Sequence, residues 1–110
     1  MFDHATPINL YLDDERDAPT GWVTARTLEE AQGILQNSAL QVMRMSLDHD
    51  LGVCAACVQA RSPCNHTGYA FVWWCAENGI WSVCKPTVHS MNPVGRAAMI
   101  QVITRYWQTP

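Results

Sequence analysis

The segment LYLDDERDAP, residues 10–19, sets a short apolar run directly against three consecutive carboxylates. The apolar residues 8–12 are typical of a buried strand. Like charges this close repel one another, so the acidic cluster is costly unless a positive group offsets it. Pro19 and Gly21 then break the chain into a loop before the next strand-like residues, 22–26. The segment therefore predicts a strand whose carboxyl end carries a cluster of acidic residues that belong to a functional site.

The rest of the chain alternates helical and strand-like segments. In order, we expect a helix over 27–38, a strand over 42–47, a helix over 69–79, a strand within 84–90 and a helix over 92–107. Thr27 and Glu30 form a capping box, Gly79 suits a helix end, and Asn92 with Pro93 suits a helix start. Such alternation predicts a three-layer α/β domain with a mostly parallel sheet of four or five strands.

Composition limits the classes of protein to which the chain can belong. Its 110 residues are enough for a single domain over 1–110, and a hydrophobic share of 48% is that of a globular protein. A net charge of -3 argues against bulk attraction to nucleic acid or anionic lipid. No signal peptide and no membrane-spanning apolar run is visible, so we expect a cytoplasmic protein with no membrane partner. Charged residues are only 15%, which leaves room for an exposed apolar face and a protein partner.

Acidic residues follow two of the predicted strands. Asp13 and Asp14 follow the first, and Asp48, His49 and Asp50 follow the strand over 42–47. Acids in loops are usually only solvated, but two clusters that each follow an apolar strand favour a common site. Neighbouring parallel strands bring their carboxyl ends to one edge of a sheet, where ligands bind. We therefore expect the four aspartates to hold a hard cation, Mg²⁺ or Mn²⁺.

The last predicted strand ends in His89 and Ser90, next to the helix that begins at Asn92. The N-terminus of a helix offers free N–H groups and a partial positive charge to an anion. Arg96 lies one turn into that helix, and Arg16 could add a second charged contact. A phosphate-bearing substrate that bridges the cation and the helix terminus is the ligand that this pattern predicts.

A second constellation lies in an aperiodic insertion over 52–67. Cys54, Cys57, Cys64 and His66 are the ligand set of a closed structural zinc site, Cys₃His. Zinc would also explain how so long a loop stays ordered. The alternatives are a flexible loop with free thiols and a redox pair of the first two cysteines.

Four blocks, taken together, resemble the cyclic-phosphate-processing receiver-like domain family, a divergent relative of the receiver domains of two-component signalling. The blocks are LYLDDERDAPTGWVTART, MSLDHDLG, TGY at residues 67–69 and VHSMNPVGR at residues 88–96. The resemblance implies a receiver-like sheet and a role in handling cyclic phosphates of nucleotides or of RNA ends. The residues that match the family are Asp13, Asp14, Asp48, His49, Asp50, His89, Ser90, Asn92 and Arg96.

The chain departs from that pattern in two ways and also differs from a conventional receiver. Its cysteine-rich segment, residues 54–66, is longer than the family's short acidic linker. A loop joins the first two strands where an ordinary receiver has a helix. A conventional receiver also needs a lysine at the end of its last strand, whereas Lys85 stands at the beginning of the candidate strand.

Two functions of different class follow. The first is a metal-dependent phosphoesterase in which His49 or His89 acts as general acid or base and Ser90, Asn92, Arg96 and Arg16 bind the phosphate. The second is a non-catalytic signalling or adaptor module of receiver-like fold, stapled by zinc.

Overall fold

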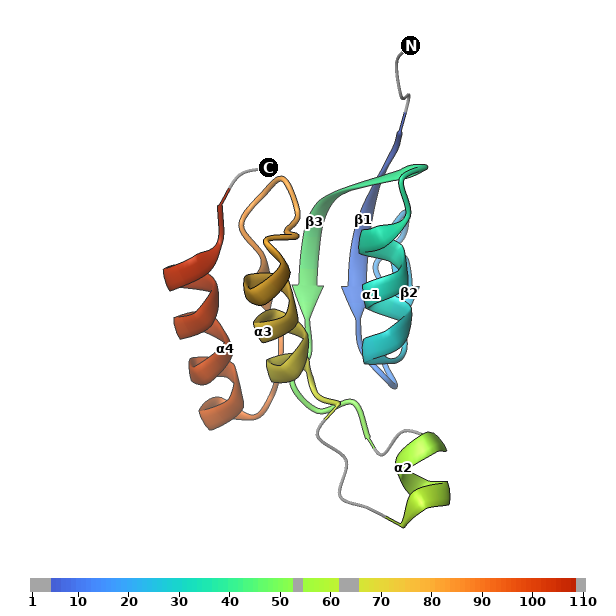
Figure 1. The fold of residues 1–110 in the computed structure, drawn as a ribbon, viewed down its shortest axis with the longest axis vertical. Coiled ribbons are helices and arrows are strands. Elements are labelled where there is room, and N and C mark those ends of the chain that lie inside the picture. The colour runs from blue at the N-terminus through green and yellow to red at the C-terminus, as the bar shows by residue number, and fades with distance from the viewer. Residues whose placement is uncertain (1–4, 53–54, 62–65, 109–110) are drawn as a thin grey trace.

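The computed structural model describes residues 5–52, 55–61 and 66–108, and its strands form a single parallel sheet. The strands are β1 (Thr6–Leu12), β2 (Val23–Ala25), β3 (Leu40–Leu47) and β4 (Thr87–Val88). Their order across the sheet is β2-β1-β3-β4, and every neighbouring pair is parallel. The α/β class and the four-stranded parallel sheet expected from the alternation of elements are confirmed (Figure 1).

The helices are α1 (Leu28–Gln36), α2 (Ala55–Ala60), α3 (Gly68–Asn78) and α4 (Pro93–Tyr106). The predicted caps are present: Thr27 accepts a hydrogen bond from the backbone N–H of Glu30, and Asn92 accepts one from that of Gly95. α3 ends at Gly79, whose φ of 65° is left-handed and therefore favours glycine. The short helix α2 was not expected, because its segment shows no periodicity. None of the helices in the described residues is both long and apolar enough to cross a membrane.

The helices α1 and α3 cover the same face of the sheet, and α4 packs beside α3 along the β4 edge (Figure 1). Right-handed crossovers explain this arrangement, because the connections from β2 to β3 and from β3 to β4 both advance in the same direction across the sheet. Side chains of the sheet that point toward these helices form the core, where Leu10, Leu12 and Leu47 of the strands and Phe71 of α3 are fully buried.

Three layers were expected from the sequence, with helices on both faces of the sheet, but among the described residues no helix covers the face opposite α1 and α3. Tyr11 pairs with Ser46 in register and is half-buried, while Arg44 and Thr87 on the same face are exposed. Because a loop rather than a helix joins β1 to β2, the described residues form two layers and leave this face of the sheet open. We call it the open face.

Candidate metal centre

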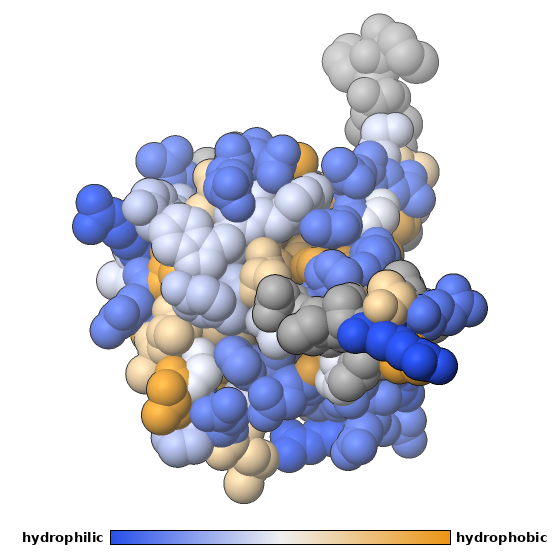
Figure 2. Space-filling view, turned by 60° about the horizontal axis from the view of Figure 1, so that its bottom comes forward, coloured by the Kyte–Doolittle hydropathy of each residue, from blue (hydrophilic) through white to orange (hydrophobic). Residues whose placement is uncertain are grey.

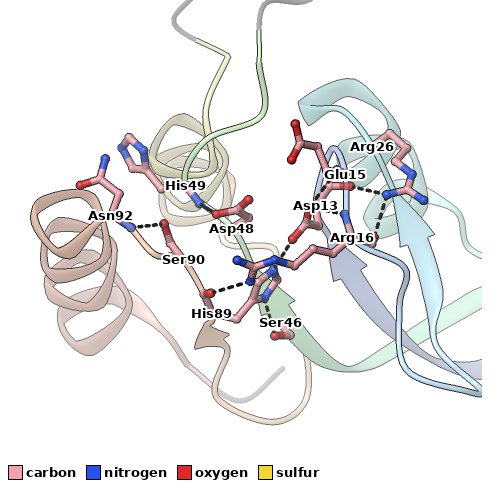
Figure 3. A network of polar contacts seen from close by, with 10 residues as sticks. All are labelled: Asp13, Glu15, Arg16, Arg26, Ser46, Asp48, His49, His89, Ser90 and Asn92. Carbon is pink, nitrogen blue, oxygen red and sulfur yellow. Dashed lines mark hydrogen bonds and ion pairs between the residues drawn. The ribbon is translucent and has the colours of Figure 1, made fainter.

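Three side chains converge where β1, β3 and β4 end. Asp13, Asp48 and His89 each offer a ligand atom, and these atoms lie within 4.8 Å of one another. Figure 3 shows the two carboxylates and the imidazole pointing into the same space from three different strand ends. Parallel strands of adjacent position bring this about, as the sequence predicted for the two aspartates. The three residues could hold a metal ion.

Asp13 is the fixed member of this group, with only 1% of its surface exposed. Its Oδ1 accepts the backbone N–H groups of Glu15 at 2.9 Å and Arg16 at 2.8 Å, and its Oδ2 lies 3.0 Å from Nε2 of His89. Burial alone would raise the pKa of Asp13, but the two backbone donors and His89 outweigh it and hold the pKa below its ordinary value of 3.8. Asp13 is therefore a carboxylate at neutral pH, and its hydrogen bonds to the backbone of the following residues fix the conformation of the acidic loop.

His89 is held on the open face by contacts that the sequence did not predict. Its Nδ1 lies 2.7 Å from Oγ of Ser46, and its ring stacks on Tyr11 with centroids 4.3 Å apart. A serine hydroxyl can either donate or accept, so Ser46 suits both neutral tautomers of the imidazole. Because Asp13 is a carboxylate, Nε2 carries the hydrogen in their 3.0 Å contact; in the other tautomer Nδ1–H would donate to Ser46, and the Nε2 lone pair could bind a metal in place of its hydrogen bond to Asp13. Tyr11 and Ser46 could have been found from the alternation of buried and less buried positions, because each lies between core residues on its strand and so points to the other face.

The other two predicted cation ligands lie outside the group of three. Burial raises the pKa of Asp14, its own backbone N–H acts in the opposite direction, and the negative charges of Glu15, Asp13 and Asp48 raise it further. Asp14 therefore stands in a field of like charge that a cation would relieve. Asp50 is exposed, and its Oδ1 lies 2.8 Å from Nδ1 of His49.

His49 lies against the start of α4. A Cβ added to Gly95 would come within 2.5 Å of the His49 ring, so the lack of a side chain at that position makes room for the imidazole. The backbone N–H of His49 donates to Oδ1 of Asp48 at 2.8 Å. Nδ1 is engaged by Asp50, which leaves Nε2 for a ligand. The structure thus places His49 between Asp13, Asp48 and His89, the three candidate ligands, and the N-terminus of α4 (Figure 3).

Of the predicted phosphate-binding residues, Ser90, Asn92 and Arg16 lie around the same place (Figure 3). Ser90 is buried and accepts the backbone N–H of Asn92 at 3.1 Å, while the side chain of Asn92 caps α4. Arg96 is exposed in the first turn of α4. Nη1 of Arg16 donates to the carbonyl oxygen of His89 at 3.4 Å.

Arg26, at the end of β2, braces the acidic loop. Its Nη1 donates to the carbonyl oxygens of Asp13 at 3.2 Å and Arg16 at 2.7 Å, and its Nη2 pairs with Asp17 at 3.3 Å. The acidic residues after β1 are therefore held by a cation from the neighbouring strand as well as by their own turn hydrogen bonds.

Residues 8–105 match the family described as the cyclic-phosphate processing Receiver domain. The chain belongs to this family. Comparison with curated proteins and with solved structures found no match. The match covers all four strands apart from the first residues of β1, and it includes the three residues that converge at the strand ends.

Part of the cysteine-rich insertion, residues 52–67, lies outside the residues that the structure describes. Cys54 and Cys64 fall outside them. Of the other two predicted zinc ligands, Cys57 is buried, and its Sγ lies 3.7 Å from Nδ1 of His66. His66 Nδ1 also lies 3.8 Å from Oε1 of Glu29 on α1. The zinc site stays a prediction.

Proposed function

We propose that this protein is a divalent-cation-dependent phosphoesterase that opens the cyclic phosphate of nucleotides or RNA ends. The observation that supports it most is the convergence of Asp13, Asp48 and His89 at the strand ends, in a chain whose family is associated with cyclic-phosphate processing. Asp13 is buried yet ionised, because two backbone N–H groups and His89 stabilise its charge, so it would present a fixed carboxylate to such a cation.

The chemistry of the ligands bears on which cation they would take. Two carboxylates suit Mg²⁺ and Mn²⁺ alike, whereas an imidazole ligand favours a transition metal over Mg²⁺. Of the two ions that the sequence suggested, Mn²⁺ fits His89 better. When bound, the cation would polarise the phosphoryl oxygens and lower the pKa of a bound water. The positive charge of the cation would also offset the repulsion between Asp14 and the carboxylates around it.

Hydrolysis of a cyclic phosphate needs a base for the attacking water and an acid for the leaving oxygen. The water oxygen forms a new bond to phosphorus, one ring P–O bond breaks, and the released ribose oxygen takes a proton from solvent water. His49 is the side chain best placed for one of these transfers, because Asp50 holds its Nδ1 and orients the ring. In this proposal it takes the proton of water through Nε2.

The phosphate itself would lie against the N-terminus of α4. Ser90 accepts the N–H of Asn92 and can donate its own hydroxyl hydrogen to a phosphoryl oxygen. The partial positive charge of the helix end and the exposed guanidinium groups of Arg96 and Arg16 would favour the dianionic product-like state.

A signalling receiver is the weaker candidate. The one lysine of the sequence, Lys85, precedes β4 instead of following it. It therefore lies at the end of the strand away from Asp13 and Asp48, whereas the receiver role requires a lysine at the carboxyl end.

The test is turnover of a nucleoside 2′,3′-cyclic phosphate with added Mn²⁺ or Mg²⁺, followed by release of the monoester. Asp48→Asn should abolish turnover, because it removes a ligand charge while keeping the side-chain shape. Glu77→Gln, the loss of one exposed carboxylate on α3, is the matched control and should keep the wild-type rate. His49→Gln should slow turnover by about 10²–10⁴-fold. Wild-type protein that opens no cyclic phosphate with either ion would refute the proposal.

A further inference from the structure

A groove of about 450 Å³ lies on the open face of the sheet, away from the helices. It is lined by Trp22, Arg44, Met45, Cys84, Lys85 and Thr87. Its volume falls within the range of roughly 300–1,000 Å³ that is common for ligand pockets. It exists because a loop joins β1 to β2, which leaves this face uncovered. Figure 2 shows a face on which hydrophilic residues predominate and apolar ones are scattered.

The groove carries positive charge in a chain whose net charge is negative. Arg44 and Lys85 are both exposed, and no acidic residue lines the groove with them. Among the described residues, the lysine and arginine side chains that form an ion pair include neither of the two. Two cations without a carboxylate partner within one groove favour an anionic occupant.

A row of aromatic rings joins the groove to the candidate metal centre. Trp22, which lines the groove, meets Tyr11 edge-on with ring centroids 6.3 Å apart. Tyr11 in turn stacks on His89. Thr87 gives a second link, because its register partner Ser46 is the residue that holds Nδ1 of His89. The groove therefore borders Tyr11 and Ser46, the two residues that hold the His89 ring.

We propose that this groove binds the nucleotides that precede a terminal 2′,3′-cyclic phosphate in single-stranded RNA, an inference that rests on the proposed function. A base stacks on Trp22, and backbone phosphates lie at Arg44 and Lys85, while the cyclic end reaches His89 and its neighbours. Lys85 precedes His89 by four residues, which span up to roughly 13 Å of extended chain. Only an oligonucleotide, and not a cyclic mononucleotide, would use both places.

The experiment measures the affinity of a fluorescently labelled short RNA with a 2′,3′-cyclic end by anisotropy, without added divalent cation, and compares it with that of a nucleoside 2′,3′-cyclic phosphate. The wild type should prefer the RNA. In the double variant Arg44→Ala, Lys85→Ala, the slope of log affinity against log salt should fall by about 1.4, since each phosphate contact to a single strand contributes about 0.7. Trp22→Ala should weaken RNA binding by about 5- to 150-fold, the effect of losing one stacked base.

Arg105→Ala, which removes one exposed charge from α4, is the control and should bind RNA as the wild type does. Both residues of the double variant are exposed, so it tests the groove even if Trp22→Ala fails to fold. Equal affinity for RNA and mononucleotide, or an unchanged salt slope in the double variant, would overturn the inference. Self-association that the double variant abolishes would overturn it too, since it would assign the open face to a second copy.

Turnover of the mononucleotide separates this inference from the proposed function. If the wild type opens the mononucleotide but the groove variants bind RNA normally, the inference fails and the proposed function stands. If RNA binding depends on the groove but neither substrate is opened, the proposed function fails, and the groove remains as an RNA-binding site.

Discussion

Two adjacent carboxylates, Asp13 and Asp14, should respond in opposite ways to the same substitution. Replacing either by asparagine removes one negative charge and keeps the shape of the side chain. The ionised form of Asp13 is stabilised in the fold, whereas that of Asp14 is disfavoured by burial and by like charges around it. In the absence of metal, Asp13→Asn should therefore destabilise the protein, and Asp14→Asn should leave it as stable or slightly more so.

The hydrogen bonds of Asp13 set the size of its effect. Its carboxylate accepts two backbone N–H groups and faces Nε2 of His89. A hydrogen bond to a charged group contributes about 1.5–3 kcal/mol and a neutral one about 0.5–1.5 kcal/mol, so neutralising an acceptor of two bonds costs about 2 kcal/mol. For a domain of this size that corresponds to a fall of roughly 8–16 °C in the melting temperature. Asp14 is partly exposed, so its gain should not exceed about 0.5 kcal/mol.

The assay is thermal unfolding of the wild type and both variants as a function of pH. The pKa of Asp13 is lowered, so its stabilising contribution is present above its ordinary pKa of 3.8 and is lost as the pH falls through the lowered value. The pKa of Asp14 is raised, so its penalty applies above the raised value and disappears below its ordinary one. Equal changes in the two variants at neutral pH, or a stabilised Asp13→Asn, would refute the reasoning.

The remaining predictions concern the packing of His49 and the cysteine-rich insertion. Gly95→Ala should lower kcat, because the new methyl group would displace the His49 ring, and it should cost about 1–3 kcal/mol of stability by overpacking. Gly33→Ala on α1, whose methyl group would meet nothing within 4 Å, is the control; it should keep kcat and stabilise the helix by about 0.4–1 kcal/mol. Elemental analysis of protein purified without chelator should find one zinc ion per chain, and Cys57→Ser should lower that content; zinc that is absent, or unaffected by the substitution, would end the zinc hypothesis.

Much of the site could be predicted because it depends on strand order alone. Asp13, Asp48 and His89 each follow an apolar strand by one residue, and parallel strands that are neighbours must bring such residues together. The caps of α1 and α4 could be predicted for a similar reason, because a side-chain oxygen at a helix start satisfies N–H groups a few residues away.

The sequence could not predict which of the aspartates would be buried at the centre of the site and which would lie beside it. Whether Asp13 or Asp14 turns inward is decided by the conformation of the loop, which is held by its own turn hydrogen bonds and by contacts from Arg26 on the neighbouring strand's end. The contacts of Ser46 and Tyr11 with His89 depend on the register of three strands, and β1 and β3 have an irregularity in register between Ile8 and Asn9. Such details arise only in three dimensions.

The open face of the sheet could not be predicted from the sequence either. The sequence indicated a loop between the first two strands, but the expected third layer still followed from the general pattern of alternating elements. The groove beside Trp22 could be recognised only once the helices were seen to lie on the other side of the sheet.

The most direct test of the account is a crystal structure of the protein grown with Mn²⁺, with anomalous diffraction used to locate the ion. The account predicts a peak bonded to a carboxylate oxygen of Asp13, a carboxylate oxygen of Asp48 and Nε2 of His89, with the last nitrogen turned from its hydrogen bond with Asp13 toward the metal. Crystals of Asp48→Asn should show no peak there. A wild-type structure with the strand ends empty at millimolar Mn²⁺, or with the ion elsewhere on the protein, would contradict the central claim.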